Sequence, residues 1–481
     1  MTNESETASG IEVARGDVPY YVEHGLTHPR AVNGTFRKIK TGLMIGLLAF
    51  WHLAPFIRWD RGPGAPDQAI LIDMAGRRAY AFFIEIWPQE VYYLTGMLLL
   101  AGITLFTMSA VAGRVWCGFL CWQTVYTDLF VMVQRLVVGD RTKMLELGRQ
   151  KWSLSKLWRL VVLNALWLVI GAGSGIALTL YFGDAFQTLN EIFTGQASFS
   201  TYLFIAIVGG FCFLLGAYAR EHVCVYVCPY SRFQTAMLDE HSLIVTYEAW
   251  RGEPRGIIRK GESFEGRGHC IDCKACVISC PTGIDIRFGN QLACIGCGLC
   301  LDACNDIMDR HDLPRGLISY ESEFNILAKE KGLATKKHII RPRTIIYASL
   351  IAIVGTGLLF TLLTRSRTAV DVLHERAPLF VQTRDGGIRN GYTFKILNME
   401  RLNHTYTLTT EGLNGATISV IGSEGMASTV PLDAEPDSVA TYRIYVTTPP
   451  GLSLSAHTDL TFVLQTDDGH VIKKTSLFAG P

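Results

Sequence analysis

The chain has 481 residues, of which 49% are hydrophobic, and its 44 basic and 43 acidic residues give a formal net charge of +1. A charge this close to zero gives no indication of a nucleic-acid partner or of an acidic substrate. All 13 cysteines lie between Cys117 and Cys304. Cysteines concentrated in this way are typical of metal binding in a reducing compartment and not of a secreted disulfide scaffold.

Five runs are apolar and long enough to cross a bilayer, which takes roughly 20 residues. They are 41–57, 91–113, 160–183, 199–219 and 344–364. The last four contain no Asp, Glu, Lys or Arg, whereas the first is short and contains His52 and Pro55. Runs of this length favour membrane helices over helices buried in a soluble core.

The basic residues in the loops predict the orientation of these helices. Lysines and arginines precede the first run, are numerous in the loop 114–159 and precede the fifth run, but the loop 184–198 has none. We therefore expect a multi-pass inner-membrane protein with its N-terminus inside and its C-terminus outside. The expected parts are a cytoplasmic N-terminal segment (1–40), four spans within 41–219, a cytoplasmic segment (220–343), the fifth span (344–364) and a periplasmic domain (365–481).

Two closely spaced cysteine pairs lie at the predicted cytoplasmic ends of the second and fourth runs. They are Cys117 and Cys121, and Cys224 and Cys228. On an α-helix this spacing places both sulfurs on one face with Cβ atoms roughly 5–6 Å apart, farther than the roughly 3.5–4.5 Å of a disulfide.

Four thiolates from two helix ends predict one soft-metal site, for which Cu(I) is the natural occupant. Zinc and another iron–sulfur centre are alternatives, and inert packing of free cysteines is the simplest one. Cys212, alone within a predicted span, is expected to belong to the core.

Two further cysteine runs lie at about 260–315. They read Cys270-x2-Cys273-x2-Cys276-x3-Cys280 and Cys294-x2-Cys297-x2-Cys300-x3-Cys304. This is the bacterial pattern for two [4Fe–4S] clusters, in which the fourth cysteine of each run serves the other cluster. We predict that one cluster is held by Cys270, Cys273, Cys276 and Cys304, and the other by Cys294, Cys297, Cys300 and Cys280. Two complete runs of this kind are a poor pattern for zinc.

The last 110 residues or so alternate short β-prone runs with turn signals such as Pro449-Pro450-Gly451. The expected strands are 405–410, 416–421, 440–448 and 459–466. Regular short strands predict an all-β sandwich of immunoglobulin type. This segment has no cysteine and no evident catalytic constellation, so we expect it to dock a partner or to stabilise the chain.

The complete chain is therefore expected to be a multi-domain membrane protein with a five-helix transmembrane domain, a ferredoxin-like α+β insert and a C-terminal β-sandwich. Together its motifs resemble the CcoG/FixG (RdxA) family, accessory proteins of cbb-type cytochrome c oxidase biogenesis. The resemblance rests on the ferredoxin repeat, the exported tail and five short motifs: PDQA at 66–69, WPQ at 87–89, YYLTG at 92–96, VWCGFLC at 115–121 and CPYSRFQ at 228–234.

The resemblance implies reduction of Cu(II) to Cu(I) on the cytoplasmic side, with the copper destined for the oxidase. The family's C-x3-C-P pairs map onto the two cysteine pairs, although Trp122 stands where the first pair should be followed by proline. The implied partners are the membrane, copper, oxidase assembly factors or a copper transporter, and an unidentified electron donor. A homo-oligomer is compatible with the sequence, and no nucleic acid is expected. The alternatives are a quinol-oxidising electron conduit and a non-enzymatic scaffold or redox sensor.

Overall fold

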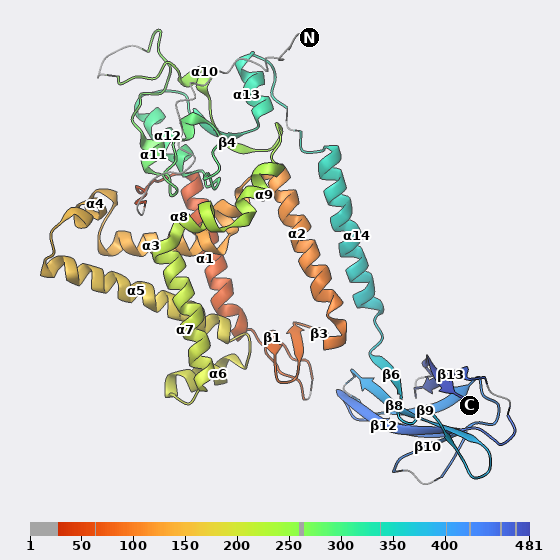
Figure 1. Ribbon diagram of the computed structural model, residues 1–481. Coiled ribbons are helices and arrows are strands. Elements are labelled where there is room, and N and C mark those ends of the chain that lie inside the picture. Colours follow the sequence, from red (N-terminus) through yellow and green to blue (C-terminus); the bar gives the residue numbers. More distant parts are fainter. Residues whose placement is uncertain are drawn as a thin grey trace, which may run out of the picture. The chain divides into compact units, whose positions relative to one another are not determined.

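The computed structural model describes residues 27–62, 64–258, 264–336, 338–400, 402–422, 425–452, 455–466 and 469–481. Residues 1–26 of the expected N-terminal segment lie outside the described residues. The chain forms two compact units, Met1–Leu358 and Leu359–Pro481 (Figure 1).

Five helical segments of the described chain are long and apolar enough to cross a membrane, which confirms the five expected runs. They are Thr35–Phe56, Pro88–Ala112, Leu154–Thr179, Phe199–Val227 and Pro342–Thr364. The first begins at Thr35 rather than at residue 41, and the fourth continues to Val227 rather than ending at 219. Cys224 therefore lies within the fourth segment and not beyond its end.

The main helices of these segments are α1 (Thr35–Leu53), α2 (Tyr92–Ala112), α5 (Leu154–Thr179), α7 (Phe199–Phe213) and α14 (Pro342–Thr364). After α7 the fourth segment continues through a π-helical turn η4 (Leu214–Ala219), the short α8 (Arg220–His222) and a second π-helical turn η5 (Val223–Val227). Shorter helices connect the spans: α3 (Trp122–Val137), α4 (Arg141–Arg149) and α6 (Ala185–Thr194).

Helices α5 and α7 approach each other through glycines. A Cβ atom added at Gly171 would lie 2.6 Å from the carbonyl oxygen of Gly209, and one added at Gly175 would lie 2.6 Å from that of Ile205. Small residues permit this close backbone approach, which is a common way for membrane helices to pack.

Replacing Gly171 by alanine is expected to destabilise the helix pair by about 1–3 kcal/mol, because the added methyl group overpacks the contact. The matched control is Gly173→Ala, since a Cβ atom at Gly173 meets no atom within 4 Å. Thermal unfolding of both detergent-solubilised variants checks this. Equal melting temperatures for the two variants would contradict it.

A small sheet that the sequence did not predict follows α1. Its strands β1 (Ile70–Asp73), β2 (Arg78–Ala81) and β3 (Ile84–Ile86) pair antiparallel in that order. Buried Gln68 anchors the sheet, because its Nε2 donates to Leu180 O at 2.8 Å and its Oε1 accepts from Ala185 N at 2.9 Å. These bonds join the PDQA motif to the end of α5.

The cysteine-rich segment forms the expected α+β insert at one end of the first unit (Figure 1). A two-stranded antiparallel sheet of β4 (Ile244–Tyr247) and β5 (Ile318–Glu321) flanks its loops. Its helices are α9 (Pro229–Met237), α10 (Ala249–Gly252), α11 (Ala275–Ile278), α12 (Leu299–Arg310) and α13 (Glu323–Glu330), with a 3-10 turn η6 (Ile286–Phe288).

The carboxylate of Asp302 on α12 accepts hydrogen bonds from the backbone of Phe36 and Arg37, at 3.2 and 2.7 Å, and so fixes the start of α1.

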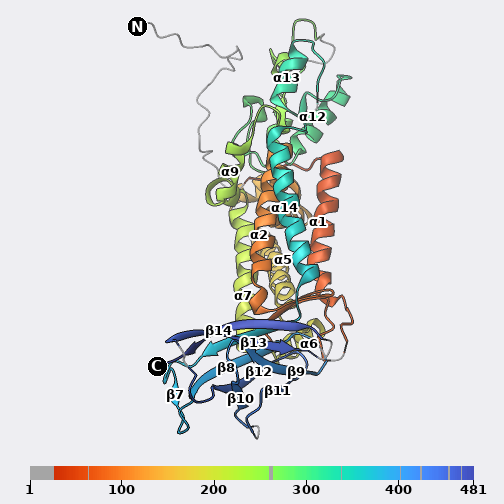
Figure 2. The ribbon, with the colours of Figure 1, turned by 90° about the vertical axis from the view of Figure 1, so that its right-hand side faces the viewer.

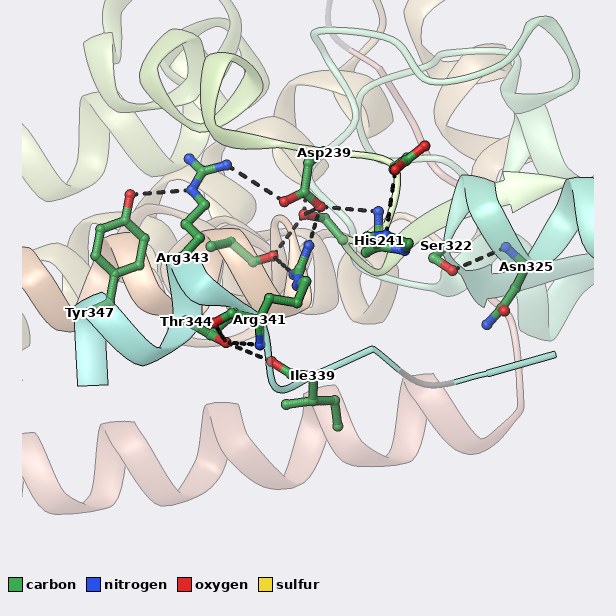
Figure 3. Close-up of polar contacts among 12 residues, drawn as sticks. Asp239, His241, Ser322, Asn325, Ile339, Arg341, Arg343, Thr344 and Tyr347 are labelled. Carbon is green, nitrogen blue, oxygen red and sulfur yellow. Dashed lines mark hydrogen bonds and ion pairs between the residues drawn. The ribbon is translucent and has the colours of Figure 1, made fainter. Parts of the chain in front are cut away.

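A polar cluster fastens the start of α14 to the rest of this unit (Figure 3). Arg341 forms an ion pair with Asp239 and donates to Ala110 O, at the end of α2, at 2.9 Å. Arg343 lies 3.7 Å from the same carboxylate, and Thr344 Oγ1 donates to Ile339 O at 2.7 Å. The fifth candidate span therefore begins at a fixed position beside the second.

The second unit is a sandwich of two antiparallel sheets, as expected (Figure 2). One sheet has the order β10-β12-β8-β6, with β7 also paired to β8, and the other has the order β11-β9-β13-β14. The strands are β6 (Thr368–His374), β7 (Val381–Gln382), β8 (Ile388–Asn398), β9 (His404–Glu411), β10 (Thr417–Val420), β11 (Thr429–Ala434), β12 (Ser438–Thr447), β13 (His457–Gln465) and β14 (Val471–Ala479). The rings of Tyr392 and Phe394 on one sheet pack against Phe462 on the other, with centroids 5.0 and 5.6 Å apart. The four predicted strands correspond to β9, β10, β12 and β13.

Candidate redox site

The eight cysteines of the insert line two separate cavities. The first has an empty volume of about 360 Å³ and is lined by Cys270, Cys273, Cys276 and Cys304. The second has an empty volume of about 340 Å³ and is lined by Cys280, Cys294, Cys297 and Cys300, and also by Cys276, which lines both cavities. The fold therefore brings together the two crossed sets that the spacing predicts.

Left-handed backbone turns wrap both runs around their cavities in the same way. The residues on either side of the second cysteine have positive φ in each run: 52° at Asp272 and 55° at Lys274, and 64° at Gly296 and 72° at Gly298. Such turns direct successive backbone N–H groups inward, and Gly296 N lies 3.4 Å from Cys294 Sγ. Glycine is needed at 298, because an added Cβ atom would lie 2.7 Å from the Phe36 ring.

The sulfur environment fits iron–sulfur clusters. Of the eight thiols only Cys273 is exposed, and burial raises the pKa of Cys276 and of Cys304 to about 12. Buried thiols become thiolates when a metal replaces the proton. Two cavities that each gather four cysteines supply the ligand number of a [4Fe–4S] cluster.

The two other cysteine pairs, Cys117/Cys121 and Cys224/Cys228, are called the membrane-face pairs below. They lie on π-helical turns, so the expected α-helical geometry was wrong. In the turn η3 (Trp116–Leu120), Cys121 N donates to Trp116 O at 3.0 Å, and in η5 Cys228 N donates to Val223 O at 2.7 Å. The second cysteine of each pair is extended, with ψ of 127° and 112°, and immediately precedes the next helix. Trp122 starts α3 just as Pro229 starts α9, so the missing proline leaves the backbone turn intact.

The fold brings the two pairs together beside the second cluster cavity. Cys117 and Cys224 pack against the same small core of Ile295, Cys297 and Leu299. Burial, with a smaller contribution from the neighbouring Cys121 and Cys228, raises the pKa of the Cys117 thiol to about 12 against the opposing charge of Arg114. Within the described residues no three His, Cys, Asp or Glu side chains are arranged to hold a single metal ion. The four cysteines of the two pairs are therefore neighbours in the fold.

Arg114 and Gly118 join the first pair to the second cluster loop. The buried guanidinium of Arg114 donates to Cys294 O at 2.7 Å and to Ser231 O at 3.0 Å. A Cβ atom at Gly118 would lie 2.8 Å from Gly296 O. The backbone that carries Cys117 thus touches the backbone that carries Cys297, with no side chain between them.

Replacing Gly118 by alanine is expected to separate these two loops and to destabilise the second cluster site by about 1–3 kcal/mol. Purified protein should then lose iron to a chelator faster than wild type does. The control is Gly102→Ala on α2, where an added Cβ atom meets nothing within 4 Å. Unchanged iron retention in the Gly118 variant would show that the close contact is not needed.

Sequence reasoning missed a group of buried charges next to this site. Lys40, Asp128, Arg220 and Glu221 are each less than 10% exposed and line a cavity with an empty volume of about 560 Å³. The available signal was the position of Lys40 and Arg220 directly beside predicted spans, where ionisable residues often serve a function.

Comparison with known proteins places both groups of cysteines within iron–sulfur family models. A model described as a 4Fe-4S dicluster domain matches residues 219–323, and one described as a 4Fe-4S binding domain matches residues 94–143. A third model, the Ig-like fold at the C-terminal of FixG, matches residues 358–481.

Full-length relatives match almost the entire chain. Nitrogen fixation protein FixG of Rhizobium meliloti is 41% identical over 493 aligned residues, covering 96% of this chain and 94% of the relative. Protein RdxA of Cereibacter sphaeroides is 42% identical over 436 residues, covering 90% and 91%. A crystal structure of a FixG-related protein from Vibrio parahaemolyticus aligns with 24% of this chain and 96% of its own, at 24% identity and a TM-score of 0.20.

Proposed function

This chain belongs to the FixG family of iron–sulfur electron-transfer proteins, and we propose that it is a membrane-bound cupric reductase. In this proposal single electrons pass from the two clusters to Cu(II) bound at the membrane-face cysteines, Cys117, Cys121, Cys224 and Cys228. The cluster ligands are the two crossed sets of four cysteines that line the two cavities.

The observation that carries the proposal is the direct contact between the first cysteine pair and the second cluster loop. Gly118 touches Gly296 and Cys297, and Arg114 binds the carbonyl of Cys294. An electron leaving the second cluster therefore has a short path to copper at Cys117. Thiolates stabilise Cu(I) over Cu(II), so the same sulfurs would favour the reduced product.

When bound, the clusters supply the one-electron chemistry, and the protein side chains hold the copper ligands in place. The thiol of Cys117 donates to Gln234 Oε1 at 3.1 Å. Gln234 is fully buried and donates through Nε2 to Ser109 Oγ at 3.2 Å, and Ser109 Oγ in turn lies 2.8 Å from Tyr230 Oη. This polar chain positions the Cys117 sulfur while it is a thiol, and the hydrogen bond to Gln234 would be given up when copper replaces the proton.

In this proposal the cysteine-rich end lies in the cytoplasm and the β-sandwich in the periplasm, an orientation supported by the excess of lysine and arginine in the loops on the cysteine-rich side. Cu(I) formed on the cytoplasmic side would then be available to a copper transporter or to assembly factors of a cbb-type oxidase. The β-sandwich, which lacks cysteine, is suited to docking such partners rather than to electron transfer.

The test is anaerobic reduction of the purified protein, addition of Cu(II), and measurement of cluster absorbance and EPR alongside a Cu(I)-specific chelator. One Cu(I) should appear for each electron that leaves the clusters. Clusters that stay reduced while copper stays cupric would rule out the reductase. They would leave the quinol conduit or the scaffold as the function.

A further inference from the structure

The cavity of about 560 Å³ lies between the start of α1, the first half of α3, α8 and the loops of the second cluster. Six charged residues line it: Arg37, Lys40, Asp128, Arg135, Arg220 and Glu221. Four are cationic and two are acidic, so the cavity disfavours a metal cation and favours a ligand rich in oxygen atoms.

Several of these buried groups have polar atoms with no hydrogen-bond partner among the described residues. Lys40 is 4% exposed, and its ammonium pairs with the Asp128 carboxylate at 4.0 Å, which is longer than a hydrogen bond. Arg220 is 1% exposed, and its Nη1 has no partner among the described residues, nor has Asp128 Oδ2. Burying such groups unpaired is costly, which indicates a ligand offering both acceptors and a donor.

Asp128 is suited to accept from that ligand. Burial opposes its ionisation, but nearby Lys40 and Arg37 outweigh burial and hold the pKa of its carboxyl below the ordinary value. Arg37 Nη1 donates to Oδ1 at 2.8 Å. The second oxygen, Oδ2, therefore remains as a charged acceptor with no donor among the described residues.

The cavity shares a wall with the second cluster site. Ile295 and Thr282 line both cavities, and Cys224 also lines the charged one. A ligand in the charged cavity would be one side chain away from the cluster. This position suits a molecule that exchanges electrons with the cluster. A structural anion would not need to lie close to a redox centre.

The remaining walls are apolar and lie at the end of a candidate membrane span. Val131 of α3, Leu299 of α12 and Pro29 contribute apolar surface beside the charged groups. Lys40 lies on α1, within the first candidate span. A ligand with a flat apolar ring, polar oxygens and a membrane-embedded tail matches this mixture.

We propose that this cavity binds the head group of a membrane quinol and that oxidation of the quinol supplies electrons to the clusters. Lys40 and Arg220 would donate to the quinol oxygens, and Asp128 Oδ2 would accept from a hydroxyl. Each quinol gives up two protons and two electrons and becomes a quinone. The two protons would leave to water by way of the Glu221 and Asp128 carboxylates, which would carry them only transiently, and the two electrons would go to the clusters, one to each. The inference rests on the clusters of the proposed function but not on copper as the acceptor.

The test uses the full chain in lipid nanodiscs without oxygen. A short-chain quinol is mixed with oxidised protein, and the matching quinone with protein that has been reduced with dithionite and freed of the excess, so that the rate is measured in both directions. Excess dithionite is removed in the same way before any copper is added. We expect Lys40→Gln to slow both reactions about tenfold or more, since a charged hydrogen bond to the head group is lost. The control is Lys38→Gln, an exposed lysine on the same helix. Equal rates in the two variants, or no reaction in wild type in either direction, would overturn the proposal.

Dithionite separates this proposal from the proposed function, because it reduces the clusters without using the cavity. Copper reduction by dithionite-reduced Lys40→Gln protein should match wild type, which also shows that the variant is folded and loaded. If wild-type protein reduced with dithionite failed to reduce copper while quinol still reduced its clusters, the cupric reductase proposal would be wrong. The quinol site would still stand.

A binding measurement provides a readout that does not depend on electron transfer. A photoreactive azidoquinone should label peptides from α1 and from Thr124–Val131 of α3, and excess quinone should suppress the labelling. Labelling confined to other helices would overturn the quinol site. So would loss of the labelling on addition of inorganic phosphate but not of quinone, which would identify an anion site.

Discussion

Replacing Cys117, Cys121, Cys224 and Cys228 together by serine should abolish copper-dependent reoxidation of the reduced protein, while dithionite still reduces both clusters. The reason is that the variant loses the thiolates that favour Cu(I) but keeps the eight cysteines of the insert. Stopped-flow absorbance with a Cu(I)-specific chelator measures the copper reaction, and EPR of the dithionite-reduced protein measures the clusters.

The matched control is Cys212→Ser, because Cys212 packs against the helix core around Phe130 and Trp167 and not against the other cysteines. It should reduce copper at the wild-type rate. The two paired variants, Cys117/Cys121 and Cys224/Cys228, should each cost nearly as much as the quadruple variant if the four thiols act as one site.

Two outcomes would contradict this expectation. If the quadruple variant still reduced Cu(II), the copper site would have to lie at other residues. Loss of iron from the variant would instead identify the four cysteines as ligands of a further iron–sulfur centre, since both pairs fall within 4Fe-4S family models.

The grouping of the eight insert cysteines could be predicted from sequence because three members of each set are close together in the chain. Two-residue gaps fix how each run turns, and the fourth cysteine of each run follows from the crossed pattern. In the structure Cys304 lines the first cavity together with the first three cysteines of the first run. Cys280 lines the second cavity together with the first three cysteines of the second run. The spans were equally clear, because uncharged runs of such length have few alternatives.

The π-helical turns could not be read from the sequence. A C-x3-C spacing fits one face of an α-helix. The extra residue in the turn becomes evident only in the fold, where Gly118 contacts Gly296, a residue far away in the sequence. Such bulges occur often at functional sites. The sequence therefore indicated which cysteines matter but not the backbone that presents them.

The charged cavity depended even more on long-range packing. Lys40 and Arg220 look like basic residues that flank a membrane span, and that role alone would leave them exposed. Their burial arises because α1, α3, α8 and the second cluster loop converge on them. No local pattern records that convergence.

The crossed ligand sets predict different losses from two cysteines on one helix. Cys300 and Cys304 lie one turn apart on α12, yet they line different cavities. Cys300→Ala should remove the second cluster and Cys304→Ala the first, and each variant should lose about half of its iron, since each cluster depends on four thiolates. Iron analysis and EPR of the reduced variants measure this directly.

The position of each cluster tells which one has been lost. A cluster in the first cavity would lie near solvent because its ligand Cys273 is exposed, whereas one in the second would adjoin Arg114 and the membrane-face cysteines. Cys300→Ala should therefore keep fast reaction with a hydrophilic oxidant such as ferricyanide but lose copper reduction altogether. Cys304→Ala should keep copper reduction by a cluster reduced with dithionite and lose the fast ferricyanide phase.

Met308→Leu is the control for general damage to α12, because Met308 is 1% exposed one turn further along the helix. A swap of similar volume there should cost less than about 1.5 kcal/mol and leave both clusters in place. If Cys300→Ala and Cys304→Ala lost the same cluster, the ligand sets would be uncrossed. The contact at Gly118 would then join the membrane-face cysteines to a cluster with different ligands. The proposed electron path from that cluster to copper would be wrong.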